Sequence, residues 1–249
     1  LAACGATSGG VGTQGTPAAS GTASGPTGPL TVFAAASLQE SFTTIADRFE
    51  KAHPGVSVTL NFGASSSLAN GITQGQPADV FASASQSTMD TVVAAGAATG
   101  STPFVSNVME IAVPPANPGQ VTGLADLARP GVKVAVCQAQ VPCGKVAAKV
   151  FENARISVTP VSEEADVKAV LTKVRLGEVD AGVVYVTDVR AAGDTVTGVE
   201  IPADLNASTT YPIATLTGAR NPWAARAFVD YVLSPAAQAV LTAAGFSAP

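Results

Sequence analysis

Charged side chains are scarce in this sequence, and acidic ones outnumber basic ones. Only 12% of the 249 residues are charged, and the net charge is −5. Because a protein that binds nucleic acid needs a basic face, this balance argues against nucleic acid as a partner. An anionic small ligand stays possible, since local dipoles rather than net charge decide that contact. With 47% hydrophobic residues, the chain can bury a sizeable core.

Histidine and cysteine are also scarce: there is one histidine, His53, and there are three cysteines. A structural zinc site takes four nitrogen or sulfur ligands, so this composition argues against zinc. A serine hydrolase needs a base within hydrogen-bond reach of its nucleophile. We expect His53 and Ser37 at opposite ends of a helix of about 15 residues, roughly 20 Å apart. A hydrolase that uses Ser66 is kept as the alternative from another class of function.

Long apolar runs are absent, since no stretch has the roughly 20 consecutive apolar residues of a membrane-spanning helix. The first four residues, Leu1-Ala-Ala-Cys4, nevertheless resemble a bacterial lipobox, in which the cysteine receives a lipid. The segment from Gly5 to Pro29 has almost only small and polar residues, which is typical of a flexible tether. We therefore expect residues 1–29 to tether an extracytoplasmic protein to the bacterial cell membrane through a lipid on Cys4.

From Leu30 onward, apolar runs alternate with amphipathic stretches, which predicts repeated strand–helix units. Such units favour an α/β fold of mostly parallel sheets flanked by helices, with ligands at the carboxyl ends of the strands. The expected strands are 30–34, 56–62, 79–82, 108–113, 132–136, 181–186, a segment within 194–200, and 211–216. The expected helices are 38–52, 67–74, 87–95, 124–128, 144–153, 164–177, 222–233 and 235–244.

Serines and small residues gather where three strands are followed by a helix or a turn. These stretches are Thr31–Ser37, Leu60–Ser67 and Val80–Ala84. Ser37 is expected as the N-cap of its helix, and ordinary capping is the alternative explanation for each serine. Because helix N-termini offer unpaired N–H groups and a positive dipole end, several of them together could hold a small oxyanion. Glu163, Glu164 and Asp166 are expected to open a helix rather than to act as catalytic carboxylates.

Four motifs resemble the periplasmic molybdate-binding proteins, which are solute receptors of ABC importers. The motifs are Val32–Leu38, Ala64–Ala69, Pro77–Ala84 and Gly182–Tyr185, and the resemblance runs from about Leu30 to Phe246. It implies a two-lobed periplasmic-binding-protein fold of type II, with the ligand in the cleft between the lobes. By this resemblance, lobe 1 comprises residues 30–107 plus 204–249, and lobe 2 comprises residues 108–203.

The resemblance also implies a ligand set of hydrogen-bond donors. Ser37 and Ser66 would supply hydroxyl groups, Cys143 and Val167 backbone N–H groups, and Tyr185 its phenol. Ala84 is expected where lobe 1 lies near the ligand. An exported compartment favours a disulfide between Cys137 and Cys143, with two free thiols as the alternative.

Such a ligand set has donors and no carboxylate, so it prefers an oxyanion that carries no proton. Molybdate, tungstate and sulfate meet this requirement, whereas monohydrogen phosphate would need an acceptor. We expect a monomeric receptor that delivers molybdate or tungstate to an ABC-transporter permease, with no enzymatic activity and no cofactor. A receptor for sulfate or another tetrahedral oxyanion is the alternative among binding proteins.

Overall fold

The computed structural model describes residues 1–5 and 25–249. Most of the expected tether, residues 6–24, therefore lies outside the described residues. Cys4 is exposed and is not part of a disulfide. Within the described residues, no single helix is long and apolar enough to span a membrane. The helices Pro222–Leu233 and Pro235–Ala244 reach that length and hydropathy only when taken together, and they are bent by 60° relative to each other.

Strands and helices alternate along most of the chain, as expected. The strands are β1 (Gly28–Ala35), β2 (Val56–Gly63), β3 (Val80–Ala82), β4 (Thr102–Val113), β5 (Val134–Cys137), β6 (Ser162–Glu164), β7 (Ala181–Tyr185), β8 (Thr197–Val199) and β9 (Ser208–Thr215). The α-helices are α1 (Gln39–Ala52), α2 (Ser65–Thr73), α3 (Gln86–Ala94), α4 (Pro142–Ala154), α5 (Val167–Arg175), α6 (Val186–Ala192), α7 (Pro222–Leu233) and α8 (Pro235–Ala244). Short 3₁₀ helices are η1 (Ala36–Leu38), η2 (Leu124–Ala128) and η3 (Gly193–Thr195).

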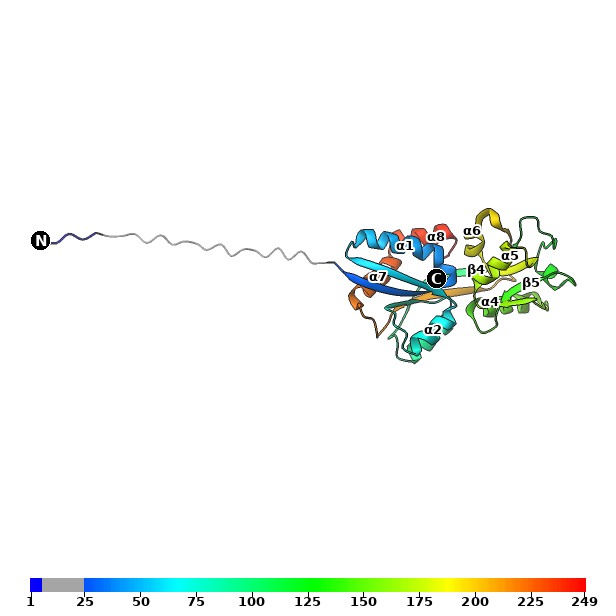
Figure 1. Cartoon of the computed structure of the whole chain (residues 1–249), viewed down its shortest axis with the longest axis horizontal. Coiled ribbons are helices and arrows are strands. Elements are labelled where there is room, and N and C mark those ends of the chain that lie inside the picture. Colours follow the sequence, from blue (N-terminus) through cyan, green and yellow to red (C-terminus); the bar gives the residue numbers. More distant parts are fainter. Residues whose placement is uncertain (6–24) are drawn as a thin grey trace.

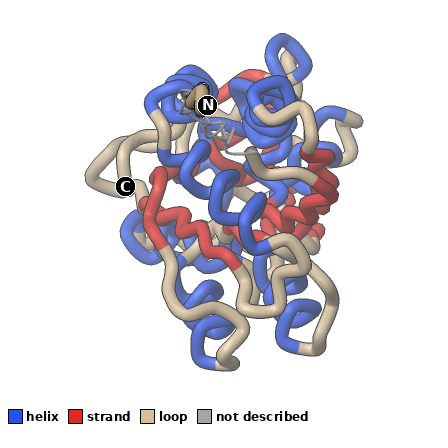
Figure 2. Tube along the Cα trace, turned by 90° about the vertical axis from the view of Figure 1, so that its left-hand side faces the viewer, coloured by secondary structure: helices blue, strands red, loops and turns tan. Residues whose placement is uncertain are grey.

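One path of paired strands runs through the whole molecule in the order β2-β1-β3-β9-β4-β7-β5-β6, with β8 beside β4. The outer pairs β1–β2, β1–β3, β5–β6 and β5–β7 are parallel. The long central strands β4 and β9 run antiparallel to each other and connect the two halves (Figure 1). Figure 2 shows the strands in the interior with helices around them. The expected α/β architecture is therefore present, with antiparallel pairing confined to the centre and to β8.

The buried apolar side chains form separate cores in the two halves. One core is built largely from residues between Met109 and Ile201. The other half is filled by residues from Leu30–Val105 and Tyr211–Phe246. In α1, Phe42, Ile45 and Phe49 recur at helical spacing and are all fully buried, so this helix lies with one apolar face on the sheet.

Several local expectations were wrong. The helix expected from residue 164 begins only at Val167, because Ser162–Glu164 pairs with β5 as a strand. The strand expected at 108–113 begins at Thr102, because its first half pairs with β9. Helix α6 was not expected at all, since its seven residues directly follow a strand without a polar break. Ser37 lies within η1 and caps no helix, because a 3₁₀ turn precedes α1.

Candidate functional site

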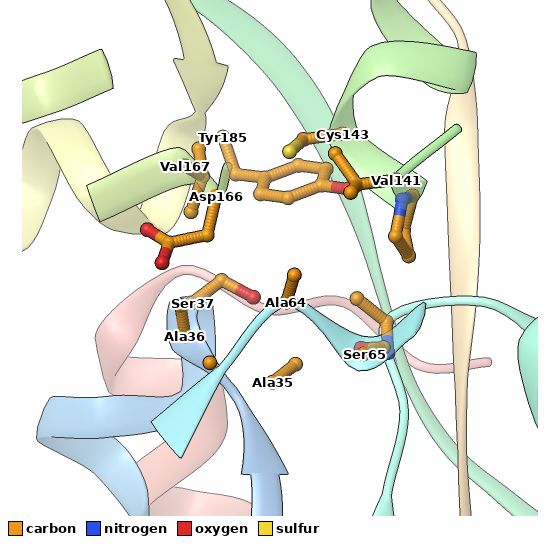
Figure 3. Close-up of a pocket in the computed structure, with 13 residues that line it drawn as sticks. Ala35, Ala36, Ser37, Ala64, Ser65, Val141, Cys143, Asp166, Val167 and Tyr185 are labelled. Atoms are coloured by element: carbon orange, nitrogen blue, oxygen red, sulfur yellow. The ribbon is translucent and has the colours of Figure 1, made fainter. Parts of the chain in front are cut away.

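A small cavity of about 20 Å³ lies where the two halves of the molecule face each other. Its walls come from segments that follow β1, β2, β3, β5, β6 and β7, all at the carboxyl ends of these strands. In Figure 3, Ser37, Ala64 and Ser65 lie on one side, and Tyr185 and Cys143 lie on the other. The lining residues are Ala35, Ala36, Ser37, Gly63, Ala64, Ser65, Ala84, Val141, Pro142, Cys143, Asp166, Val167 and Tyr185.

Ser37 borders the cavity and is 4% exposed. It follows the run Ala34-Ala-Ala36, in which Ala35 and Ala36 line the cavity with side chains small enough for a close approach to the backbone. The Oγ atom of Ser37 lies 2.8 Å from the hydroxyl oxygen of Tyr211, which stands on β9. The sequence analysis placed Ser37 at the site, but it did not identify Tyr211 beyond its place in a strand.

The second serine at the cavity is Ser65, whereas the sequence analysis named Ser66. Ser65 is 1% exposed and opens α2, while Ser66 is half-buried and does not line the cavity. The helix begins two residues earlier than expected, which turns Ser65 inward. The Oγ atom of Ser65 accepts a hydrogen bond of 2.9 Å from the N–H group of Ala84. Its own proton is therefore free to be donated into the cavity.

Ala84 lines the cavity, as expected, but both of its backbone groups already have partners. Its N–H group donates to Ser65, and its carbonyl oxygen accepts a 2.6 Å hydrogen bond from the Thr209 hydroxyl. Ala84 therefore contributes a small, close wall to the cavity and holds Ser65 in place.

The opposite wall includes the first turn of α4. Pro142 occupies the first turn of α4, where a missing N–H group costs nothing, and Cys143 follows it. The first N–H groups of a helix have no intrahelical acceptor, so those of this turn can serve a ligand. Cys143 is joined to Cys137 at the end of β5 by a disulfide, with a Cα–Cα distance of 5.7 Å. The bond ties this turn to the strand that precedes it.

Helix α5 presents its N-terminus to the same cavity through Val167. The preceding residue, Asp166, is the N-cap, and its Oδ1 accepts hydrogen bonds of 2.9 and 3.0 Å from the N–H groups of Lys168 and Ala169. The N–H group of Val167 is not used by this cap. Asp166 itself borders the cavity, so one carboxylate lies on its wall, although the expected ligand set contains none. In Figure 3 its carboxylate group points away from the Tyr185 ring.

Tyr185 ends β7 and lies at the cavity with 1% of its surface exposed. Its hydroxyl group is buried and has no hydrogen-bond partner among the described residues. Burial, with the nearby Tyr211 and Asp188, raises the pKa of Tyr185 well above its usual value, so the phenol stays protonated. A buried donor without an acceptor is rare in folded proteins. This hydroxyl group therefore points to a ligand that accepts hydrogen bonds.

A buried ion pair between Asp188 and Lys168 holds the backbone of Tyr185 in place. Asp188 is fully buried, and its Oδ2 accepts a 3.1 Å hydrogen bond from the Tyr185 N–H group. Its Oδ1 lies 3.0 Å from the Lys168 ammonium group, which also contacts Glu40 at 2.8 Å. Because Glu40 is in α1 and Lys168 is in α5, this cluster joins the two sides of the cavity.

The hydrolase alternative finds no support in this geometry. His53 follows the last residue of α1, and its ring packs on Phe49 at a centroid distance of 4.5 Å. Ser37 precedes the same 14-residue helix, which is about 21 Å long. Ser66 lies outside the cavity walls. The described residues hold no cluster of three or more histidine, cysteine, aspartate or glutamate side chains that could bind a metal ion.

Comparison with known proteins gives one consistent family. Residues 30–247 match the family model described as bacterial extracellular solute-binding protein. The chain is 43% identical over 234 residues to the molybdate-binding protein ModA of Mycobacterium tuberculosis, covering 91% of this chain and 90% of that protein.

Two solved structures resemble the fold. The substrate-binding domain of a putative molybdenum ABC transporter from Clostridium difficile is 30% identical, with a TM-score of 0.66 and coverage of 89% of this chain and 99% of that chain. The periplasmic molybdate-binding protein of Azotobacter vinelandii is 20% identical, with a TM-score of 0.79 and coverage of 88% and 99%. These matches confirm the fold class expected from the sequence.

Proposed function

Since the chain belongs to the family of bacterial extracellular solute-binding proteins, we propose that it is a receptor that captures molybdate for an ABC importer. The resemblance to molybdate-binding proteins inferred from the sequence motifs is confirmed by the 43% identity to such a protein over 91% of the chain. A family of binding proteins implies capture and release of a solute, and no chemical reaction. We extend the proposal to tungstate because it has the same charge and shape as molybdate.

The buried hydroxyl group of Tyr185 is the observation that carries this proposal. It lacks a partner among the described residues and belongs to a cavity that two serine hydroxyl groups also border. The N-termini of α4 and α5 add backbone N–H groups and the positive ends of two helix dipoles. A tetrahedral oxyanion accepts hydrogen bonds from every direction, so it would satisfy all these donors at once.

We assign ligand contacts to Ser37, Ser65 and Tyr185 through hydroxyl groups, and to Cys143 and Val167 through backbone N–H groups. This set replaces Ser66 by Ser65, because Ser65 borders the cavity. In this proposal, residues 30–107 plus 204–249 form one lobe, residues 108–203 form the other, and the ligand draws them together. Closure removes water from the ion, which strengthens each hydrogen bond.

The partners follow from the same proposal. The receptor would pass its ion to the permease of an ABC importer and act as a monomer. A lipid on Cys4 would hold it at the outer face of the cell membrane, with residues 5–29 as the tether. Mass spectrometry of the protein purified from bacterial membranes tests this point, since an unmodified Cys4 would contradict the anchor.

Calorimetric titration of the chain with molybdate, tungstate, sulfate and phosphate tests the function. We expect molybdate and tungstate to bind at 1:1 stoichiometry, and sulfate and phosphate to bind far more weakly or not at all. Equal binding of sulfate would replace the molybdate assignment by a general oxyanion receptor. Absence of heat with all four ions, in protein whose circular dichroism shows it to be folded, would refute the proposed function.

A further inference from the structure

We propose that Tyr211 is a positioning residue that fixes the direction of the Ser37 hydroxyl proton and so makes the cavity select oxyanions that carry no proton. The inference deepens the proposed function and rests on it, because it concerns the same site. It depends on one hydrogen bond between two buried hydroxyl groups and on which of the two oxygens faces the cavity.

Tyr211 is held rigidly at the back of the cavity wall. Its side chain is completely buried. Its ring contacts Phe246, Tyr185 and Phe104 in edge-on arrangements, with centroid distances of 5.4, 6.2 and 6.4 Å. These three aromatic contacts fix the ring, so the Tyr211 hydroxyl oxygen stays 2.8 Å from the Oγ atom of Ser37.

The 2.8 Å distance allows either hydroxyl group to donate, and the position of the cavity favours Tyr211 as the donor. Each of the two groups carries one proton and can also accept. Ser37 borders the cavity, whereas Tyr211 does not. Burial raises the pKa of Tyr211, so its proton is present at all ordinary pH values and needs an acceptor. When Tyr211 donates to Ser37, the Ser37 proton is left to point into the cavity, toward a bound anion.

At the other serine of the cavity, Ser65, the direction of the hydrogen bond is fixed by the type of donor. Ser65 Oγ accepts from the N–H group of Ala84, and an N–H group can only donate. Both serine oxygens are thus occupied by structural donors, and both protons are directed to the ligand. A monohydrogen oxyanion would bring a proton of its own and find neither serine ready to accept it. Asp166 is the carboxylate on the wall; its Oδ1 accepts from two N–H groups, and the carboxylate group points away from the Tyr185 ring (Figure 3).

The test replaces Tyr211 by phenylalanine, which keeps the ring and removes the hydroxyl group. Ser37 Oγ then becomes free to accept a proton. We expect molybdate affinity, measured by calorimetry at mildly alkaline pH, to fall about twofold to tenfold, the value of one hydrogen bond. We expect phosphate, mainly a monohydrogen ion at that pH, to bind better to Tyr211→Phe than to the unchanged protein. Sulfate carries no proton, so its affinity should follow that of molybdate.

Two further variants separate this role from a general loss of structure. Tyr231→Phe alters a tyrosine of α7 that packs on Phe49, and it should leave all affinities unchanged. In a Ser37→Ala background, Tyr211→Phe should no longer change the ratio of molybdate to phosphate affinity, because the hydroxyl group that it directs is gone. Thermal unfolding of each variant without ligand records any change in stability.

The outcomes distinguish this inference from the proposed function. If the unchanged protein binds none of the ions, the proposed function fails. If the unchanged protein binds molybdate but Tyr211→Phe leaves phosphate binding unaltered or weakens it in parallel with sulfate, the role of Tyr211 is refuted. A change in the affinity ratio that persists in the Ser37→Ala background would also refute it, since the effect would then not pass through Ser37.

Discussion

Replacing Lys168 by methionine should destabilise the protein strongly and in a way that depends on pH. The Lys168 ammonium group lies 3.0 Å from Asp188, which is completely buried, and 2.8 Å from Glu40, whose side chain is 51% exposed. The methionine keeps the apolar stem and removes the charge. Asp188 would then be a buried carboxylate without a cation, which costs about 3–5 kcal/mol at neutral pH. Loss of the contact with the exposed Glu40 adds about 0–1 kcal/mol.

The sign of the pH effect follows from the pKa of Asp188. Burial raises this pKa above its usual value, and Lys168 pulls it down again. A carboxyl group with a raised pKa in the folded state adds stability below its ordinary pKa of about 4 and loses it as the pH rises through the folded-state value. Without Lys168 that value moves higher, so the stability lost to ionised Asp188 is recovered on mild acidification.

Urea unfolding at neutral and mildly acidic pH measures both effects. Lys168→Met should lose about 3–5 kcal/mol at neutral pH and clearly less at acidic pH. Lys149→Met, which breaks an exposed pair with Glu152, should cost about 0–1 kcal/mol at both. A loss for Lys168→Met that stays below about 1 kcal/mol, or that does not shrink on acidification, would show that Asp188 does not carry an uncompensated charge.

Three further predictions concern the cavity and its walls. Tyr185→Phe should weaken molybdate binding about tenfold or more, as expected for a hydrogen bond to a charged acceptor. It should leave the ligand-free protein at least as stable, because the removed hydroxyl group has no partner among the described residues. Calorimetry measures the affinity and thermal unfolding the stability, and a stability loss without an affinity loss would contradict the prediction. Gly144→Ala should destabilise by about 1–3 kcal/mol, since a Cβ atom there would clash with the backbone carbonyl group of Gln138. Gly123→Ala, with open space around it, is the control in urea unfolding. Reduction of the disulfide of α4 should cost about 2 kcal/mol, the entropy of a short loop, and weaken molybdate binding modestly; unchanged affinity after verified loss of the bond would refute that link.

Much of the fold could be predicted from the sequence because the residue patterns that define its helices and strands lie within short stretches of the chain. The apolar face of α1 and the prolines at the start of α7 and α8 fix these helices to within a residue or two. The sheet order could not be predicted, because the pairing of β9 between β3 and β4 joins segments more than a hundred residues apart. The true length of β4 could not be predicted for the same reason, because its first half pairs with β9 and, at Ser106, with Ser247.

At the candidate site, too, residues within motifs could be predicted, whereas contacts between distant segments could not. Cys143, Val167 and Tyr185 were identified from motifs, and the structure places all three at one cavity. Among three consecutive serines, the cavity is lined by Ser65 and not by the expected Ser66, because such a run carries no signal for where the helix begins. Tyr211 could not be identified, since its role depends on a contact with Ser37 across 174 positions of the chain.

The place of β9 in the sheet has a consequence for how the chain acquires its shape during synthesis. The segment between Met109 and Ile201 is continuous and supplies most of one core, so most contacts of that core can form as soon as the segment has been made. The half that contains β1 must wait for β9, because that strand fills the gap between β3 and β4. Its assembly therefore needs contacts of high sequence separation, which form slowly. Truncation before Ser208 would remove a central strand and leave two exposed edges, a state prone to aggregation.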